Sequence, residues 1–229
     1  MILSIHIPKT AGTSFGDGLR KFYGSRLLHR FDIDHWPGFA TPETIAIHHQ
    51  KMIEFKSCLQ QTMSTYDVIH GHFVADQYAA LFPDAKLVSF FRDPYQQTIS
   101  HYEFLSSIPE THDHRAVKLF HEERMSLIDF IRWEAFSNEQ SYLLGKVPLQ
   151  QLTVIGLTEE FGKSLDLFNH VFDTRINNEF WHRRNPDKSN DSYDIKAEIR
   201  KEISQHRAAD IELYERAKEA FRRQAFPNT

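Results

Sequence analysis

One unit recurs along the chain: a short apolar run, a loop, and a segment of helical periodicity. The runs are uninterrupted and bounded by turn or charged residues, which is typical of buried strands. They are Ile2–Ile7, Tyr66–His70, Lys86–Phe91 and Leu152–Leu157. Such alternation predicts a single α/β domain over residues 1–229, with three layers in which helices flank a central parallel sheet. Ligands are then expected at the carboxyl ends of the strands.

Helices are predicted where apolar residues recur every three or four positions. Thr13 or Ser14 is expected to cap the first helix. Residues 24–49 are expected to be irregular apart from a strand near Leu27–Phe31, and Gly71-His72 is expected to form a turn. Two predicted helices begin near Thr13 and near Val74. The others cover Gln50–Met63, Tyr95–Ser106, one or two segments of 125–145, Glu159–Phe172, and a charged pair of segments within Ile195–Phe221.

The composition limits the classes of partner and compartment. The chain has 229 residues and a formal net charge of −4 with histidine neutral, so we expect no nucleic-acid partner, and any anion site must be local. Cys58 is the only cysteine, which excludes an internal disulfide and argues against a structural zinc cluster. The first apolar run is too short for a signal peptide or membrane anchor, and we expect a cytoplasmic protein.

The loop after the first strand carries an anion-binding pattern. It reads His-Ile-Pro-Lys-Thr-Ala-Gly-Thr-Ser over residues 6–14, and it lies where a helix begins. Backbone N–H groups and the helix dipole favour an anion there, Gly12 permits close approach, and Thr13 and Ser14 add hydroxyl donors. Because Lys9 precedes the glycine, the loop does not match the Walker A pattern. The plainer interpretation is a surface lysine beside an ordinary helix cap.

A second anion-binding pattern follows the strand Lys86–Phe91. Arg92-Asp93-Pro94 places a guanidinium at the end of this strand, and Ser100 lies about two turns into the next predicted helix. An arginine and a hydroxyl in this arrangement suit one phosphate that is held from two sides. Together with the first loop, they predict a ligand with two phosphate groups.

Both patterns resemble motifs of the PAPS-dependent sulfotransferases, specifically the carbohydrate sulfotransferases that include heparan sulfate 2-O-sulfotransferase. Residues 6–14 are similar to the loop that binds the 5′-phosphosulfate in that family, and Phe91–Tyr102 is similar to its 3′-phosphate motif. Shorter segments are also phrased as in these enzymes, namely Asn138–Gln140, Ile155–Glu160, Asn185–Ser189 and Asp210–Tyr214. The resemblance implies a P-loop-like α/β fold and the transfer of a sulfuryl group from PAPS to a hydroxyl group, with PAP as the product.

The resemblance also implies roles for the matching residues. The donor-binding residues of the first loop would be Lys9, Thr10, Gly12, Thr13 and Ser14. Lys9 would contact the bridging oxygen between phosphate and sulfate, while Arg92 and Ser100 would hold the 3′-phosphate. Members of the family often carry an arginine three residues after the motif proline, where this chain has Gln97. One contact to the 3′-phosphate, or one local salt bridge, is therefore expected to be missing.

His70-Gly71-His72 supplies candidates for the general base, because the 2-O-sulfotransferase group carries a similar His-Gly-His with a catalytic histidine. A histidine near its ordinary pKa can accept the proton of a hydroxyl, whereas a lysine at neutral pH is mostly charged. We predict His72 as the base and His70 as the second candidate; the plainer interpretation is a pair of structural histidines. We expect the two rings to point to opposite faces of the sheet, with no third ligand at suitable spacing, so no metal is predicted.

The polar segment His182–Ser189 is predicted to be a loop that folds over the donor, in which Lys188 and Ser189 help to bind it. The plainer interpretation is a solvated basic loop. The acceptor would carry a hydroxyl group, on a sugar or a small molecule, and the sequence does not define it further.

Two other functions remain open at this point. A small-molecule kinase would use the same fold class, but it should offer Gly-Lys-Ser/Thr and an acidic residue for magnesium at a strand end, whereas Asp93 sits behind Arg92 here. A non-catalytic nucleotide-binding protein would bind the donor without turnover, and the presence of Lys9 and His72 argues against it.

Overall fold

The computed structural model describes residues 1–32, 41–177 and 192–225, and within them five parallel strands form one sheet. The strands are β1 (Ile2–Ile5), β2 (Leu27–Phe31), β3 (Val68–His72), β4 (Lys86–Phe91) and β5 (Leu152–Leu157), in the spatial order β2-β3-β1-β4-β5. Ile2 at the start of β1 lies opposite Val68 on one side and Lys86 on the other. The predicted α/β fold with a central parallel sheet is confirmed.

The helices separate the strands along the chain, as the alternation predicts. They are α1 (Gly12–Tyr23), α2 (Pro42–Ser57), α3 (Leu59–Thr65), α4 (Ala75–Leu81), α5 (Pro94–Ser107), α6 (Arg115–Glu122), α7 (Leu127–Arg132), α8 (Glu139–Leu144), α9 (Phe161–Phe172), α10 (Ala197–His206) and α11 (Ala208–Ala225). Short 3₁₀ turns cover 24–26, 134–136, 149–151 and 158–160.

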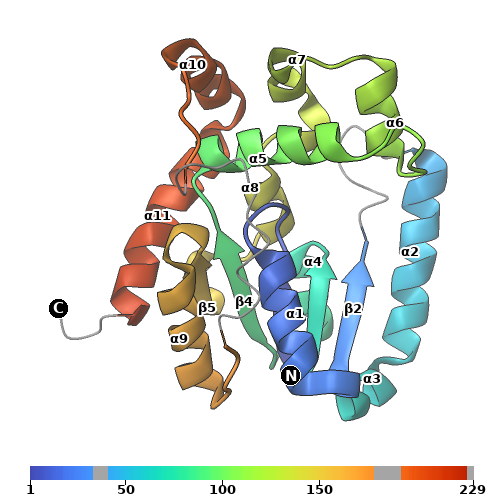
Figure 1. The fold of residues 1–229 in the computed structure, drawn as a ribbon. Coiled ribbons are helices and arrows are strands. Elements are labelled where there is room, and N and C mark those ends of the chain that lie inside the picture. Colours follow the sequence, from blue (N-terminus) through green and yellow to red (C-terminus); the bar gives the residue numbers. More distant parts are fainter. Residues whose placement is uncertain (33–40, 178–191, 226–229) are drawn as a thin grey trace.

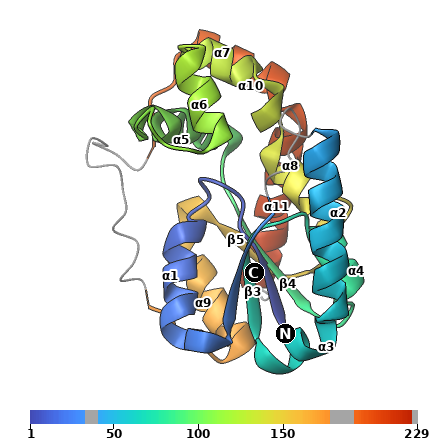
Figure 2. The same ribbon diagram turned by 90° about the vertical axis from the view of Figure 1, so that its right-hand side faces the viewer.

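Helices cover both faces of the sheet, so the molecule has three layers (Figures 1 and 2). On one face, Phe15 and Leu19 of α1 and Phe168 of α9 pack on the side chains of the strands that point toward them. On the other face, helices α4, α8 and α11 bury a larger apolar cluster together with residues of α2, α5, α6 and α7. Because both faces are covered, β1, β4 and β5 are almost continuously apolar, as expected for a parallel sheet, whereas β2 and β3 carry polar residues toward their carboxyl ends.

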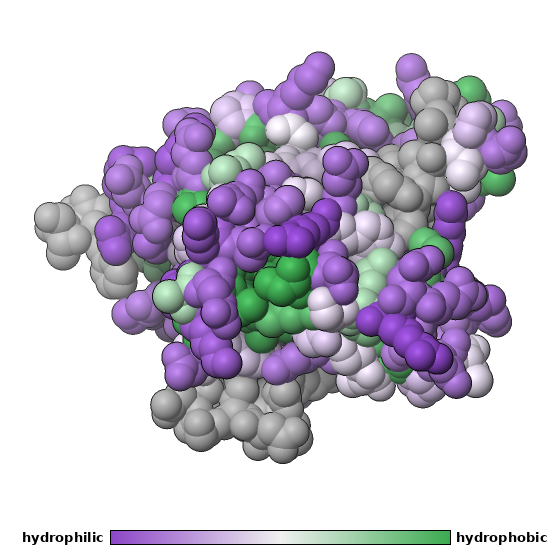
Figure 3. All heavy atoms as spheres, turned by 90° about the horizontal axis from the view of Figure 1, so that it is seen from above, coloured by the Kyte–Doolittle hydropathy of each residue, from purple (hydrophilic) through white to green (hydrophobic). Residues whose placement is uncertain are grey.

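The carboxyl ends of the strands point toward α5, which runs across them, and α6, α7 and α10 lie beyond it (Figure 1). Seen from that side, the surface is mostly hydrophilic, with a hydrophobic area enclosed by hydrophilic residues (Figure 3). Across the described part of the chain, no helix combines the length and apolar character that a membrane crossing requires.

Several predicted boundaries are wrong for identifiable reasons. The helix predicted at Gln50–Met63 is two helices, α2 and α3, and α2 starts earlier because Pro42 and the capping box of Thr41 with Thr44 begin it. Gly71-His72 is not a turn, since both residues belong to β3. Neither Thr13 nor Ser14 caps α1, because the helix already begins at Gly12 and both hydroxyls lie inside its first turn.

Candidate functional site

The loop between β1 and α1 is held in an unusual backbone conformation. Lys9 has φ 63° and Ala11 has φ 66°, in the left-handed region that non-glycine residues rarely occupy. Thr10 between them is buried, and its Oγ1 donates to the carbonyl of Ile7 at 2.8 Å. No described side chain caps the start of α1, so the N–H groups of its first turn remain for another acceptor. Strain of this kind persists mainly where the surroundings impose it, as at ligand sites.

Gly12 is required by the histidine ring beneath it. A Cβ added to Gly12 would lie 1.8 Å from Cδ2 of His6 and 2.2 Å from its Nε2, so no larger residue fits without moving the ring. The ring of His6 is stacked on those of His72 and His70, with centroid distances of 4.2 and 5.1 Å. The glycine therefore lets the start of α1 sit directly on the histidines at the ends of β1 and β3.

Arg92 ties the second motif to the first. Its guanidinium is largely buried, and Nη1 donates to the carbonyl of Lys9 at 2.9 Å. The backbone of Arg92 is held on both sides by Gln140, whose Oε1 accepts from its N–H at 3.1 Å and whose Nε2 donates to its carbonyl at 2.8 Å. Burial lowers the pKa of Arg92, and the nearby Glu159 opposes that shift. A guanidinium stays charged even so, which leaves a buried cation next to the strained loop.

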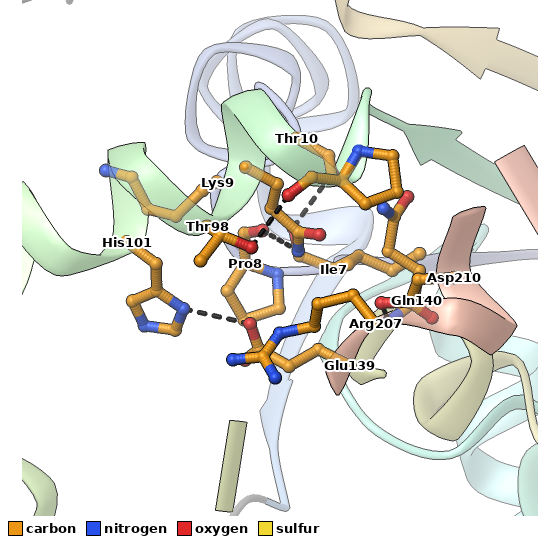
Figure 4. Close-up of polar contacts among 12 residues, drawn as sticks. Ile7, Pro8, Lys9, Thr10, Thr98, His101, Glu139, Gln140, Arg207 and Asp210 are labelled. Carbon is orange, nitrogen blue, oxygen red and sulfur yellow. Dashed lines mark hydrogen bonds and ion pairs between the residues drawn. The ribbon is translucent and has the colours of Figure 1, made fainter. Parts of the chain in front are cut away.

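The shorter segments singled out in the sequence form the support of this strand end. Asp210 accepts from the N–H of Gln140 at 3.1 Å (Figure 4). It also accepts from the N–H of Ser141 at 2.7 Å. Glu159 accepts from the N–H of Asp93 at 2.9 Å and from the hydroxyl of Tyr214 at 3.0 Å. Asn138–Gln140, Ile155–Glu160 and Asp210–Tyr214 thus converge on Arg92-Asp93 from three parts of the chain.

Gln97 does not occupy a site for an anion. Its side chain is 3 % exposed, and Nε2 donates to the carbonyl of Pro8 at 2.9 Å. The residue that departs from the family pattern therefore fixes α5 to the first loop. Asp93 is likewise committed, because its Oδ1 accepts from the N–H groups of Tyr95 and Gln96 at 2.8 and 3.2 Å and caps α5.

A cavity of about 1020 Å³ opens where these elements meet, at the carboxyl ends of the strands. Most of the predicted site residues line it, namely Lys9, Gly12, Thr13, Ser14, Arg92, Ser100 and His72. Thr10 and His70 are not part of its wall. The predicted contributors Lys188 and Ser189 lie outside the described residues.

The ammonium group of Lys9 lies over an aromatic ring in this cavity. Its Nζ is 4.3 Å from the centroid of the Phe104 ring, within the range of a cation–π interaction. Phe104 belongs to α5 and is 45 % exposed, so one face of α5 presents both this ring and Ser100 to the cavity. The side chain of Lys9 therefore extends into the cavity and away from the buried core.

His72 and His70 differ in their surroundings. Nδ1 of His72 lies 2.5 Å from the carbonyl oxygen of His6, which can only accept, so Nδ1 carries the proton and Nε2 the lone pair. Burial lowers the pKa of His72 to about 4, against the opposing effect of that hydrogen bond. His72 is therefore neutral at neutral pH, with its lone pair on the nitrogen that a base would use.

His70 is a packed residue under α1. It is 3 % exposed, Nδ1 lies 2.8 Å from Oγ of Ser4, and a Cβ on Gly16 would be 2.7 Å from Nε2. Burial lowers its pKa to about 3, with nearby histidines adding to the shift. The expectation that the rings of His70 and His72 point to opposite faces is wrong, because residues two apart on a strand share a face and both rings stack on His6.

Several residues that line the cavity had no role assigned from the sequence, although some of them lie within the quoted motifs. They are His6, Gln96, His101, Glu103, Phe104, Glu159, Lys163 and Tyr193, among others. Glu103 and Phe104 lie one turn beyond Ser100 on the same face of α5, so the helical period offered a signal for these two. Tyr193 is fixed by a pair of hydrogen bonds with Gln96, at 3.0 and 2.6 Å, which no local pattern predicts.

Among residues 1–32, 41–177 and 192–225, no group of three or more histidine, cysteine, aspartate or glutamate side chains is arranged to hold a metal ion.

Comparisons with known proteins give weak similarities. No protein-family model matches the chain, and no curated protein matches it. Among solved structures, it is similar to a sulfotransferase from Alicyclobacillus acidocaldarius, with a TM-score of 0.47 and 17% identity over 96% of this chain and 94% of that one. It is also similar to mouse sulfotransferase SULT7A1, solved in complex with PAP, with a TM-score of 0.37 and 10% identity over 92% of this chain and 65% of that one. The proposals below rest on the chain's own residues.

Proposed function

We propose that this protein transfers a sulfuryl group from PAPS to a hydroxyl group of an acceptor, a sugar or a small molecule. The observation that carries the proposal is that both predicted phosphate motifs meet in one cavity and are joined by the hydrogen bond from Arg92 to the carbonyl of Lys9. PAP, the nucleotide part of this donor, carries one phosphate on each side of its ribose. Two separate cationic grips around one cavity suit such a ligand.

The residues present fit the donor. Gly12, Thr13 and Ser14 offer N–H groups and hydroxyls at an uncapped helix start, which suits the 5′-phosphate. Arg92 and Ser100 border the same cavity from β4 and α5 and suit the 3′-phosphate. The cavity exceeds the volume of an ordinary small-molecule pocket, so donor and acceptor can occupy it together.

PAPS, when bound, supplies an activated sulfuryl group whose acceptance by a hydroxyl leaves PAP. The chain's own residues then have to remove a proton from that hydroxyl and stabilise negative charge on the leaving phosphate. We assign the proton to Nε2 of His72, because its Nδ1 is held by the His6 carbonyl. We assign the charge to Lys9, whose ammonium group leaves the ring of Phe104 for the leaving oxygen. In-line transfer requires no covalent bond to the protein.

The alternative kinase function loses support from the geometry around Asp93. A kinase needs a carboxylate at a strand end to hold magnesium, and the carboxylate of Asp93 accepts two N–H groups of α5. A non-catalytic nucleotide-binding protein would hold the donor through the same residues. Only a measurement of turnover distinguishes it from a sulfotransferase.

The proposal is tested by calorimetric titration with PAP, and separately with ATP and magnesium. Wild type is compared with Ser100→Ala, Arg92→Ala and, as a matched control, Arg132→Ala, whose guanidinium pairs with Glu202 away from the cavity. Ser100→Ala removes one hydroxyl and its hydrogen bond with the side chain of Tyr193, whereas Arg92→Ala removes the buried charge and frees the carbonyl of Lys9.

We expect wild type and the Arg132→Ala control to bind PAP in preference to ATP. Ser100→Ala should weaken PAP binding by roughly 10-fold, the value of one hydrogen bond of about 1.4 kcal/mol, and Arg92→Ala should weaken it by more than that. Preference for ATP, or equal affinity of all four proteins for PAP, would overturn the assignment and favour the kinase.

A further inference from the structure

A second histidine borders the cavity and is held by a buried carboxylate. His101 on α5 is 5 % exposed, and its Nδ1 lies 2.9 Å from Oε2 of Glu139, the first residue of α8, which is 6 % exposed. Figure 4 shows that Nδ1 of the His101 ring points at the carboxylate of Glu139. No described residue bonds to Nε2, and the ring lines the cavity, so Nε2 is the atom through which His101 can reach a ligand.

The surroundings of this pair are buried and largely apolar. The rings of Phe136 and Phe130 pack against it, at centroid distances of 4.7 and 5.7 Å, so water is displaced from the hydrogen bond. Oε1 of Glu139 is buried and has no hydrogen-bond partner within the described residues. A buried carboxylate with one unpaired oxygen is costly, and a proton arriving on the neighbouring imidazole offsets part of that cost.

The charged and titratable groups around His101 come from four elements. Glu139 lies at Nδ1, with the buried guanidinium of Arg207 near its far side, and the charge of Glu139 raises the pKa of Arg207 against the larger lowering by burial. Lys9 and His72 border the same cavity from the first loop and β3. A positive charge on His101 would lower the pKa of His72, so the two histidines lie within electrostatic reach of each other.

His101 and His72 differ in the group that accepts the hydrogen bond from Nδ1–H. A histidine whose Nδ1–H is held by a carboxylate keeps its lone pair on Nε2 and gains a counter-ion for the imidazolium that forms. His72 has a backbone carbonyl in the corresponding place, which orients the ring but carries no charge. Of the two, only His101 has a carboxylate beside the ring as a counter-ion for the imidazolium that forms.

We propose that His101, positioned by Glu139, is a second catalytic base of the cavity and takes the proton of acceptors whose hydroxyl lies at its Nε2 instead of at Nε2 of His72. In this step the O–H bond of the acceptor breaks, an N–H bond forms at Nε2 of His101, and Glu139 stays ionised. The acceptor oxygen bonds to sulfur as the sulfur–oxygen bond to the donor phosphate breaks, and that electron pair leaves with PAP. The inference rests on the function proposed above.

The test compares wild type with His101→Asn and Glu139→Gln. Glu139→Gln keeps an acceptor for the Nδ1–H and removes only the charge. His121→Asn is the matched control, because this histidine of α6 bonds to the carbonyl of Ile108 and does not line the cavity. Each protein is measured for PAP affinity by calorimetry and for the rate of PAPS cleavage between pH 5 and 9, with water as acceptor. Wild type and Glu139→Gln are also followed by NMR of ¹⁵N-labelled histidine with PAP bound.

We expect PAP affinity within about 2-fold of wild type in every variant. The cleavage rate should fall by roughly 100-fold in His101→Asn and by about 10-fold in Glu139→Gln, and should not change in His121→Asn. NMR of wild type should show His101 protonated at Nδ1 and not at Nε2 at neutral pH. The proposal is overturned by a wild-type rate and pH profile in His101→Asn, by loss of PAP affinity parallel to the loss of rate, or by a proton on Nε2 in place of Nδ1. If the proposed function is wrong, wild type does not bind PAP. The tautomer of His101 is then determined by NMR without PAP.

Discussion

Acidification should destabilise this protein through the histidines buried at the end of β3. The pKa of His70 is about 3 and that of His72 about 4 in the folded chain, against 6.5 for an ordinary histidine, mainly because burial disfavours their charged forms. Between pH 6.5 and these values the unfolded chain binds protons that the folded chain does not. The free energy of unfolding must therefore fall as the pH falls through this window.

The magnitude follows from the two pKa values. Between pH 7.5 and 5 each histidine removes about 2 kcal/mol from the free energy of unfolding, and together they remove about 4 kcal/mol. Burial raises the pKa of Asp210 to about 6, so the folded chain binds a proton there before the unfolded chain does as the pH falls. This adds about 1.4 kcal/mol to the free energy of unfolding over the same range. The net loss expected from these groups is about 2.6 kcal/mol, and the lowered pKa of His6 adds to it.

A variant isolates the contribution of one histidine from all other titrations. In His70→Asn the amide can still reach the hydroxyl of Ser4, but the titrating ring is gone. Urea unfolding of wild type and variant is measured at half-unit steps from pH 7.5 to 5. The variant should start less stable because the ring leaves a space beside Phe15, yet lose about 2 kcal/mol less than wild type across the range. Parallel curves for the two proteins would show that His70 does not contribute to the pH dependence of stability.

Three further substitutions test the loop after β1. Gly12→Ala should lower the free energy of unfolding by about 1–3 kcal/mol in urea unfolding and weaken PAP binding in calorimetry, because its Cβ would lie 1.8 Å from the ring of His6. Gly162→Ala, with no atom within 4 Å of the added Cβ, should leave the free energy of unfolding unchanged. Gln97→Ala leaves a loop carbonyl without its donor and should weaken PAP binding by roughly 10-fold in titration calorimetry, whereas unchanged affinity would separate this bond from the site. Ala11→Gly relieves a φ of 66° and should raise the free energy of unfolding by up to about 1 kcal/mol, and a loss of stability would contradict the assigned strain.

The parts of the fold that the sequence predicts well are those with a strong local pattern. Lys86–Phe91 and Leu152–Leu157 are strands with the predicted bounds, since each is an uninterrupted apolar run in a buried sheet. The start of α2 was missed because its apolar side chains form no clean stripe, and Ile47 and Ile53 are 52 % and 63 % exposed. Helix α6 was not predicted, although its apolar face is buried.

The features of the site also differ in whether they have a local pattern in the sequence. The two phosphate motifs could be found because each lies within one strand–loop–helix unit of the sequence. The contact between Arg92 and Lys9 joins residues 83 positions apart, and that between His101 and Glu139 joins residues 38 apart, so neither has a local signal. The difference between His70 and His72 depends on which ring lies beneath α1, and only the packing of that helix decides it.

Sulfuryl transfer and phosphoryl transfer are distinguished by following two labels in one experiment. The protein is incubated with ³⁵S-labelled PAPS and γ-³²P-labelled ATP at equal concentration, with magnesium, a set of sugar and phenolic hydroxyl compounds, and water as the background acceptor. We predict that ³⁵S is transferred with equimolar formation of PAP, and that Lys9→Met slows this transfer without releasing the nucleotide. Transfer of ³²P would identify a kinase, and binding of PAP with neither label transferred would identify a nucleotide-binding protein without catalysis.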